Sequence, residues 1–242
     1  MILSGHQPVY LPGIILFNKM AMSDLFMFVG HCQFSPKSWQ QRNRIDLGGR
    51  EMWLSVPVLK RERFGQAIDE VELVDEPWRR KHLGSIRQAY QKRPHFARYF
   101  PELEVMLSRP YASLGDLNRS LIMMIRDWLA ITTPIVDSRD HPQIIGHKTD
   151  MLIQMCQAVG ADRYLSNEGS RVYVQEDLMA EAGILHCWQV FDHPVYDQGR
   201  QPFLPDMSVI DLVFSLGPDA GEVVKNCGRI EPGACIPAGM VP

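Results

Sequence analysis

Short apolar runs of strand length alternate with helix-length amphipathic stretches at both ends of this chain, and this alternation constrains the fold more than any other feature. Near the N-terminus, residues 1–3 and 25–29 are predicted to be buried strands that flank a helix over residues 14–23. Near the C-terminus the same alternation predicts strands at 134–136, 163–165 and 184–190 and helices at 148–159 and 176–181. Strands joined by helices pair in parallel, so we predict an α/β fold with a mainly parallel, Rossmann-like sheet.

The middle of the chain is predicted to be a helical insert over residues 77–130. Pro77 suits the first position of a helix, and apolar or aromatic side chains follow it at spacings of four. A second helix is expected over residues 95–107. Ser113 and Asp116 form a capping box in front of the clearest apolar stripe in the sequence.

Shorter strands are expected before this insert. Residues 42–45 and 52–58 have strand character and are joined by a glycine turn at 48–49. Residues 68–74 alternate apolar and acidic side chains, as a half-exposed strand does.

The chain is expected to form one domain. No internal repeat, low-complexity segment or change of composition marks a linker, and a second capping box is expected at residues 208–211. We predict a single α/β domain over residues 1–225, with the helical insert inside it. The Gly- and Pro-rich residues 226–242 are expected to be an irregular tail.

Composition and charge exclude several classes of protein. Of the 242 residues, 45% are hydrophobic and 22% are charged, which is typical of a globular protein and not of a disordered one. The net charge of −3 argues against a sequence-independent nucleic-acid binder, which needs a basic field. Basic residues do gather at 37–50 and 79–98, where patches of this size more often contact an anionic ligand or neighbouring carboxylates. No nucleic-acid partner is predicted.

The N-terminus lacks the basic start and long apolar core of a signal peptide. No stretch approaches the ~20 apolar residues that a membrane-spanning helix needs. The five cysteines are an odd number at unpatterned spacing, which indicates reduced thiols. The cytoplasm is therefore the expected compartment.

A polar, proline-stiffened segment follows the first predicted strand. It begins Gly5-His6-Gln7-Pro8 and runs on through Tyr10 to Pro12. In open α/β sheets ligands bind beyond the carboxyl ends of the strands, so this segment suits a rigid binding loop. On residue types alone, His6 and Gln7 could equally satisfy the backbone groups of a tight turn.

A second polar cluster occupies residues 34–44. It combines the indole of Trp39 with several amides and the cations Lys37, Arg42 and Arg44. Trp39 could stack on a sugar or base, and either arginine could hold a phosphate or carboxylate through two hydrogen bonds. The alternative is a solvated loop that runs into an edge strand.

These segments belong to an ordered series of motifs that spans roughly residues 4–217. The motifs are Gly5-His6-Gln7-Pro8, Tyr10-Leu11-Pro12, Phe17-Asn18-Lys19, Ser23-Asp24, Gln33-Phe34, Ser38-Trp39-Gln40, Arg42-Asn43-Arg44-Ile45, Trp53-Leu54-Ser55-Val56-Pro57-Val58, Trp78, Lys81-His82, Tyr90, Gly160-Ala161-Asp162, Tyr164-Leu165-Ser166, Tyr173, Tyr196, Gln198, Ser208 and Asp211-Leu212. With this series the chain resembles the WbqC-like protein family.

The resemblance implies a bacterial protein of the kind often associated with surface-polysaccharide (O-antigen) gene clusters. A role suggested for the family is transfer of glycine or a related acyl group onto a sugar. The chain departs from the family pattern at Gly30-His31, where paired aspartates usually end a strand. Any role of those carboxylates is in doubt here; His31 could substitute as a base, or could mark a changed substrate.

Several other chemistries lack their motifs. There is no Walker loop or Gly-x-Gly-x-x-Gly turn, which leaves P-loop NTPases and ordinary dinucleotide enzymes unsupported. Neither the zinc patterns His-Glu-x-x-His and Cys-x-x-Cys nor the hydrolase motif Gly-x-Ser-x-Gly occurs, and no metal site is predicted. Cys32 beside His31 permits a thiol nucleophile, although a buried, inert cysteine is the alternative that we favour.

The leading hypothesis is an acyl or aminoacyl transferase that acts on an amino-sugar or similar small amine. His6 would be the general base, because an unperturbed imidazole has a pKa near 6.5. Gln7 and Tyr10 would position the amine acceptor, with Tyr10 and His31 as further catalytic candidates.

The anionic donor, an acyl thioester or a nucleotide-sugar, would be held mainly by the second polar cluster. The candidates are Lys37, Trp39, Arg42, Asn43 and Arg44, with Lys148 and Tyr164 from the C-terminal half. We expect residues 5–10 and 42–44 to line one cleft at the carboxyl edge of the sheet. The competing functions are a glycosyltransferase that uses a nucleotide-sugar and a non-catalytic binding protein of polysaccharide assembly. The sequence leaves the cofactor and the oligomeric state open.

Overall fold

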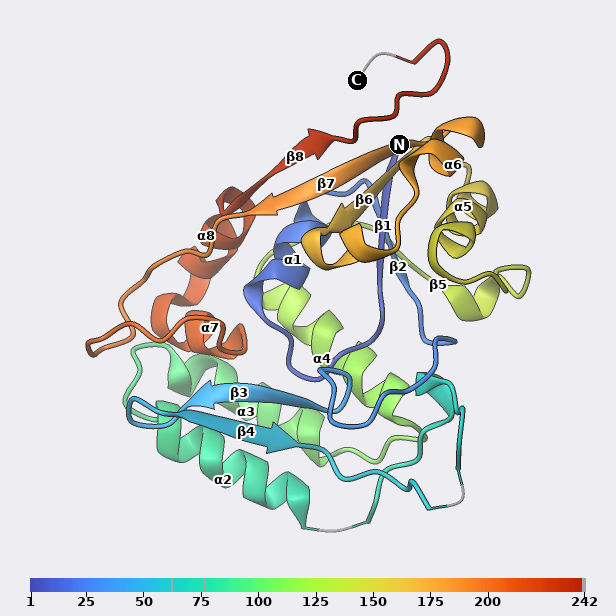
Figure 1. Cartoon of the computed structure of the whole chain (residues 1–242). Helices are drawn as coiled ribbons and strands as arrows, with labels where there is room; N and C mark the ends of the chain where they lie inside the picture. The colour runs from blue at the N-terminus through green and yellow to red at the C-terminus, as the bar shows by residue number, and fades with distance from the viewer. Residues whose placement is uncertain (62, 76, 241–242) are drawn as a thin grey trace.

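The computed structural model describes residues 1–61, 63–75 and 77–240, with a six-stranded sheet at its centre (Figure 1). Across the sheet the strands run in the order β5-β2-β1-β6-β7-β8. In that order their bounds are Ile135–Asp137, Leu25–Phe28, Ile2–His6, Arg163–Asn167, Leu185–Phe191 and Gly228–Pro232. All neighbours pair in parallel except β7 and β8, which are antiparallel. The prediction of a mainly parallel, Rossmann-like sheet is confirmed.

The strand order places a topological switch point between β1 and β6. The chain first extends the sheet from β1 to β2 and β5, and then crosses back to add β6 and β7 on the other side. In sheets of this kind the connections leave opposite faces at the switch point, and the crevice beyond the strand ends there binds ligands. His6 ends β1 and Asn167 ends β6, so these two residues mark the crevice.

Helices cover both faces of the sheet, as the side chains of β2 require. Phe26 and Phe28 point to one face, and Met27 between them points to the other. The first face packs against α1 (Ile14–Ala21), α4 (Leu114–Trp128), α7 (Ile210–Leu216) and α8 (Ala220–Asn226). The second face packs against α5 (Lys148–Val159) and α6 (Glu176–Glu181).

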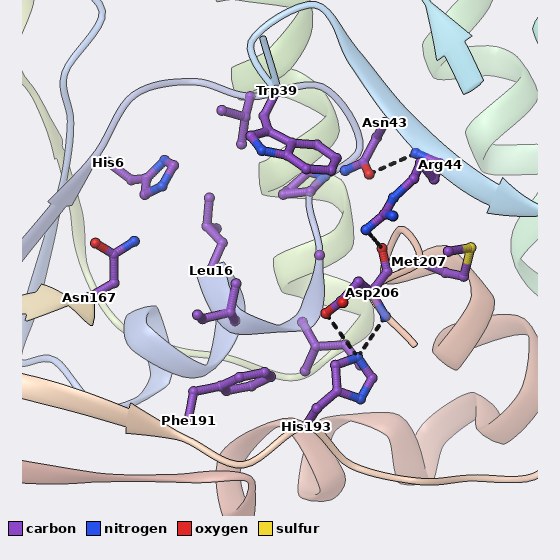
Figure 2. A pocket seen from close by; sticks show the side chains of 15 residues that line it. His6, Leu16, Trp39, Asn43, Arg44, Asn167, Phe191, His193, Asp206 and Met207 are labelled. Carbon is purple, nitrogen blue, oxygen red and sulfur yellow. Dashed lines mark hydrogen bonds and ion pairs between the residues drawn. The ribbon is translucent and has the colours of Figure 1, made fainter. Parts of the chain in front are cut away.

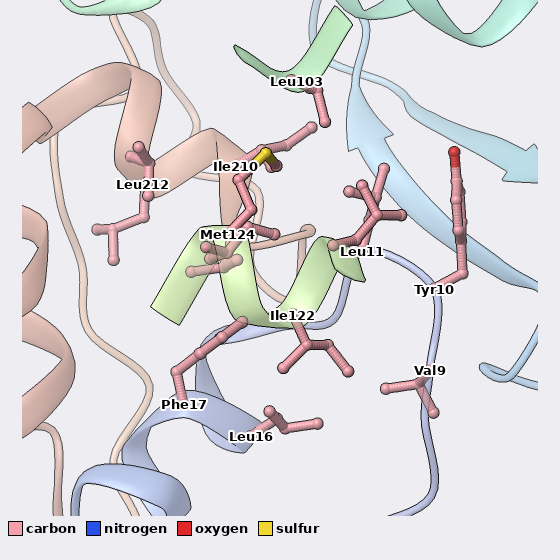
Figure 3. Packing of buried hydrophobic residues seen from close by; sticks show 14 of the residues in the cluster. Val9, Tyr10, Leu11, Leu16, Phe17, Leu103, Ile122, Met124, Ile210 and Leu212 are labelled. Carbon is pink, nitrogen blue, oxygen red and sulfur yellow. The ribbon is translucent and has the colours of Figure 1, made fainter. Parts of the chain in front are cut away.

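The segment between β2 and β5 contains a hairpin and three helices. The hairpin joins β3 (Arg42–Asp46) to β4 (Glu51–Ser55), and the helices are α2 (Trp78–Tyr90), α3 (Phe96–Ser108) and α4. Their apolar side chains belong to the same cluster as those of α1 and α7, with the loop residues Val9 to Leu11 packed between them (Figure 3). The expected cap of α4 is present, because Ser113 Oγ accepts a 3.1 Å hydrogen bond from the Asp116 amide.

Residues 68–74 do not form the predicted strand. Ile68–Glu70 is a turn of 3-10 helix, and beyond it Leu73 makes a single bridge to Val58. Ile68 and Val71 are fully buried at a spacing of three, which suits such a turn. The Glu70 carboxylate closes the turn by accepting a 2.9 Å hydrogen bond from the Ala67 amide.

Two expectations near the C-terminus are also wrong. Residues 228–232 are not irregular but form β8, which pairs along the edge of β7. The capping box at residues 208–211 is absent: α7 begins at Ile210, and no side-chain cap is present at its N-terminus. Asp211 instead lies fully buried in the protein.

The Asp211 carboxylate is the centre of a polar network in the core. It accepts hydrogen bonds from the hydroxyls of Tyr90 (3.1 Å) and Tyr196 (3.2 Å) and from the amide of Gln198 (3.3 Å). Burial raises the pKa of Asp211, against the opposing charge of Arg93. These motif residues tie α2 to α7 and to the loop before it, so their role in this structure is to hold the fold together.

Two buried histidines make the fold sensitive to acid. Burial lowers the pKa of both His82 and His186 to about 4, from an ordinary value of 6.5. At these two sites the unfolded chain therefore binds up to two more protons than the folded chain between these values. The stability from the two neutral rings is complete above pH 6.5 and is lost as the pH falls toward 4.

We expect these two sites to lower the Tm by about 5–10 °C per pH unit as the pH falls from 6.5 toward 4, and His6, whose pKa burial lowers to about 3, adds a similar share per ring. Thermal denaturation at a series of pH values would measure the total slope. The variant His82→Gln should lose about a third of the total slope, because the other two buried rings remain. A Tm that stays constant between pH 7 and pH 5 would contradict the neutral burial of both rings.

Candidate functional site

A cavity of about 380 Å³ lies beyond the carboxyl ends of β1 and β6 (Figure 2). His6 and Asn167 lie at one end, and Arg44, His193 and Asp206 lie at the other. The apolar floor comes from the first turn of α1 and from Phe191 at the end of β7. The cavity therefore occupies the crevice that the strand order marks as a ligand site.

A second, more polar cavity of about 150 Å³ shares the His6 and Asn167 wall. The remaining polar lining comes from six side chains: Gln7, Lys19, Tyr164, Ser166, Ser170 and Tyr173. Cys32, Met151 and Leu152 line it on the α5 side. His6 is thus the side chain from the predicted binding loop that faces both spaces.

His6 has a defined tautomer. Its Nδ1 lies 2.8 Å from the Gln7 carbonyl oxygen, which can only accept, so Nδ1 carries the hydrogen and Nε2 keeps a lone pair. Burial, with a smaller contribution from the charge of Lys19, lowers the pKa of His6 to about 3 against the opposing Gln7 hydrogen bond. The ring is therefore neutral at physiological pH, and an ordinary histidine pKa does not apply to it.

Lys19 was not identified from the sequence as a site residue. It lies in α1 and is only 3% exposed, and its ammonium Nζ donates a 2.9 Å hydrogen bond to the Gly5 carbonyl oxygen. Burial lowers its pKa to about 7. The sequence signal for Lys19 is a lysine within a mostly apolar helical segment. Burying an unpaired lysine cation is energetically unfavourable, so a lysine at such a position indicates a functional role.

Arg44 and Trp39 form the outer wall of the larger cavity. The Arg44 guanidinium lies 5.3 Å from the Trp39 ring centre and 5.7 Å from that of Trp53, its cross-strand partner. It also donates to a Glu51 carboxylate oxygen (2.8 Å) and to the Asp206 carbonyl (3.2 Å). Trp39 is 48% exposed, so it presents an aromatic plane beside a fixed cation.

Asn43 and Gln7 line the cavities with polar atoms that are already bonded to the protein. The Asn43 amide donates to the carbonyls of Tyr10 (3.3 Å) and Leu11 (2.7 Å), and its oxygen accepts from the Arg44 amide (2.8 Å). Asn43 therefore holds the loop where Leu11 adopts a positive φ of 40°. The Gln7 oxygen similarly accepts from the Gln40 side chain at 2.7 Å.

Tyr10 does not line either cavity, contrary to its expected role at the acceptor. Its side chain is fully buried, and its hydroxyl lies 2.8 Å from His82 Nδ1 in the core beside Trp78. Tyr164 does line the smaller cavity, where its hydroxyl lies close to Gly5. Burial raises the pKa of Tyr164 well above its ordinary value, so its phenol stays protonated.

Three predicted binding cations lie outside both cavities. Arg42 stacks on Trp53, with its guanidinium 4.2 Å from the ring centre. Lys37 is exposed on the loop before β3, and Lys148 is exposed at the start of α5, beside a separate surface hollow. The expectation that residues 5–10 and 42–44 line one cleft therefore holds for His6, Val9, Asn43 and Arg44 alone.

His31 belongs to a charged cluster at the ends of β2 and β5. Its Nδ1 lies 2.9 Å from Ser138 Oγ, and burial lowers its pKa while the nearby Asp69 opposes the shift. Arg119 binds the carboxylates of Asp69 and Asp137 beside it. A side chain at Gly30 would meet the Asp69 carboxylate and the Arg119 guanidinium, so Asp69 fills the space beside this glycine.

Cys32 lines the smaller cavity but has no feature of an activated nucleophile. Burial raises the pKa of its thiol, the Gln7 side chain opposes this, and Sγ lies 3.9 Å from the sulfur of Met151. A protonated, half-buried thiol is a poor nucleophile, which fits the inert cysteine that we favoured.

Asn167, His193 and Asp206 were missed by sequence reasoning. The Asn167 oxygen accepts from Ser170 at 3.0 Å, and His193 Nε2 accepts a 3.0 Å hydrogen bond from the Asp206 amide. Asn167 lies two residues beyond the predicted strand at 163–165, which is a usable signal for a site residue. His193 and Asp206 lie in a long loop after β7, and no sequence pattern connects them to His6.

Comparison with known proteins assigns the family. The profile of the WbqC-like protein family matches residues 7–223. The chain belongs to the WbqC-like protein family. Uncharacterized protein Rv1507c of Mycobacterium tuberculosis is 31% identical over 225 residues, which cover 91% of this chain and 96% of that protein. No solved structure matches the chain.

Membrane-spanning helices and metal-binding clusters are both absent from the part of the chain that the structure describes. Within residues 1–61, 63–75 and 77–240, no helix is both long and apolar enough to cross a lipid bilayer. Within the same ranges, no group of three or more histidine, cysteine and acidic side chains is arranged to hold a metal ion.

Proposed function

We propose that this WbqC-like protein is a transferase that moves an acyl or aminoacyl group, such as a glycine-type group, onto the amine of an amino-sugar or similar small molecule. The observation that carries the proposal is the neutral imidazole of His6, which keeps a free acceptor nitrogen at the switch-point cavity. The proposed setting is surface-polysaccharide metabolism, as the family resemblance implies, or secondary metabolism.

In the proposed reaction, His6 Nε2 accepts a hydrogen bond from the amine of the acceptor. The amine nitrogen attacks the acyl carbonyl carbon, so a C–N bond forms and the C–S bond of a thioester donor breaks. The amine proton passes through His6 Nε2 to the departing thiolate. Burial and Lys19 disfavour the imidazolium, so His6 transfers this proton onward rather than storing it.

The donor is proposed to lie toward Arg44 and Trp39. Acyl thioesters of coenzyme A and nucleotide-sugars both carry phosphates and a base, which an arginine and an exposed indole can bind. A glycosyltransferase is the second candidate, because dinucleotides and related ligands bind at the switch point of Rossmann-like sheets. A non-catalytic binding protein is the third. All five cysteines are unpaired, which favours the cytoplasm, where both kinds of donor are made.

A ligand screen by thermal shift tests the donor assignment. A donor at ~100 times its Kd stabilises the folded protein by ~2.7 kcal/mol, so we expect the Tm to rise by ~5–10 °C with an acyl-coenzyme A. Added salt should weaken the effect, because Arg44 contributes through its charge. Arg44→Met should reduce the shift, and Arg42→Met on the same strand but outside the cavity should not.

The screen also separates the three candidates. Stabilisation by acyl-coenzyme A, followed by a mass gain on an amino-sugar, supports the transferase. Stabilisation by nucleotide-sugars alone supports the glycosyltransferase, and a Tm that no anion changes would rule out a polar donor at this cavity.

A further inference from the structure

The smaller cavity contains a buried cation without a matching anion. Lys19 Nζ has the Gly5 carbonyl as its hydrogen-bond acceptor. Among the residues that the structure describes, no carboxylate lies within ion-pair distance of it, and burial is what shifts its pKa. An uncompensated buried ammonium is strongly unfavourable, and it is relieved either by loss of its proton or by a bound anion.

The space beside Lys19 has the chemistry of an anion site. Among the described residues that line this 150 Å³ cavity, none has an acidic side chain. Its hydroxyls form a chain in which Tyr173 donates to Ser170 (2.9 Å) and Ser170 donates to the Asn167 oxygen (3.0 Å). Among the described residues the Asn167 side-chain nitrogen donates no hydrogen bond, so its amide hydrogens are available for a ligand.

The size and charge of the cavity select a small monoanion. At ~30 Å³ per water molecule, the volume corresponds to about five waters, which is enough for a carboxylate and the few atoms around it. One ammonium neutralises one carboxylate. A phosphate dianion would leave a net negative charge in a buried site, which is costly.

We propose that Lys19, with Asn167 and the surrounding hydroxyls, forms a subsite for a small carboxylate. A ligand seated there has its next atoms against His6, the wall that the two cavities share. The substrate class is therefore a small molecule that carries a carboxylate close to its reacting group. This inference does not depend on the transfer reaction, because binding is measured without turnover.

Carboxylate binding at Lys19 has a defined pH dependence. The titratable groups that line the cavity with Lys19 are His6, Cys32, Tyr164 and Tyr173. The pKa of His6 is lowered to about 3, and burial raises those of Cys32 and Tyr164. A bound carboxylate favours the protonated lysine, so binding above pH 7 takes up a proton. The affinity should fall by up to about tenfold per pH unit as the pH rises from 7 toward 9.

The experiment measures the binding of acetate, its neutral analogue acetamide and inorganic phosphate by thermal shift at constant ionic strength, from pH 7 to pH 9. We expect acetate to stabilise the protein, with the stated loss of affinity at high pH, and acetamide to have no effect. Lys19→Met should abolish the acetate effect, whereas Lys92→Met, at an exposed position, should keep it. Calorimetry in two buffers of different ionisation enthalpy should record the proton uptake.

Three results would overturn the proposal: equal effects of acetate and acetamide, an acetate effect that survives in folded Lys19→Met, or an affinity that stays constant between pH 7 and pH 9. Tighter binding of phosphate than of acetate would overturn the assignment to a monoanion. If Lys19→Met does not fold, the pH dependence and proton uptake of the wild-type protein decide the question.

Discussion

Replacing His6 by alanine is expected to reduce turnover by ~10²–10⁴-fold, the range in which a positioned proton-transfer group contributes. The variant loses the Nε2 acceptor at the wall shared by the two cavities, and with it the proton path from the amine to the leaving group. The pH profile is a second readout. Because the pKa of His6 is lowered to about 3, His6 itself should cause no loss of rate between pH 7 and pH 5, and the loss in that range should follow protonation of the acceptor amine and move with the acceptor that is used.

This measurement requires the true donor and acceptor, and a folded variant. His141→Ala, at a partly buried histidine outside both cavities, is the matched control and should keep its turnover. Cys32→Ser separates the mechanisms, because it should do little if the thiol is only part of the cavity wall. Loss of turnover in Cys32→Ser, with an acyl adduct on Cys32 by mass spectrometry, would point to covalent catalysis. Full activity of His6→Ala would refute the proposed mechanism.

Arg119→Met is expected to destabilise the protein by ~3–5 kcal/mol, the usual cost of breaking a buried ion pair. The Arg119 side chain is 8% exposed, and its guanidinium binds Asp69 and Asp137 together, with Nε 2.6 Å from an Asp137 oxygen. Its loss leaves two partly buried carboxylates with the half-exposed Arg139 as their remaining cation. Chemical denaturation would measure the change in the free energy of unfolding.

Arg139 provides a control at the same carboxylates. It lies 3.2 Å from an Asp137 oxygen and 3.0 Å from an Asp116 oxygen, but its side chain is 49% exposed. Exposed ion pairs contribute about 0–1 kcal/mol, so Arg139→Met should change stability little. Equal losses in the two variants would mean that burial does not decide the strength of this cluster.

The general architecture could be predicted because parallel sheets leave a strong pattern. The apolar runs of β1 and β2 and the amphipathic helices between strands are local features, and the position of His6 at a strand end follows from them. The failure at residues 68–74 is also local: apolar side chains at 68, 71 and 73 fit both a strand and a tight turn. Which of the two forms depends on the packing of Ile68 and Val71 against the core.

The candidate site was only partly predictable, because a polar side chain does not reveal its partner. Tyr10 and Asn43 looked like ligand-binding groups, but Tyr10 bonds to His82, 72 residues away, and Asn43 bonds to the backbone of Tyr10 and Leu11. Lys19 was not predicted as a site residue because the helix that carries it has the apolar pattern of an ordinary core helix. Only the meeting of β1, α1 and β6 brings its ammonium to a cavity.

The C-terminal strand determines how the sheet meets the solvent. At one edge β5 has only three residues, and at the other β8 ends at Pro232 and carries the exposed pair Arg229 and Glu231. Short strands, prolines and charges at an edge all discourage pairing with a second sheet. The seven residues of β7 would otherwise present their backbone to any neighbouring chain. By covering the edge of β7, β8 therefore disfavours edge-to-edge aggregation of the sheet. This role is separate from any chemistry at the cavity.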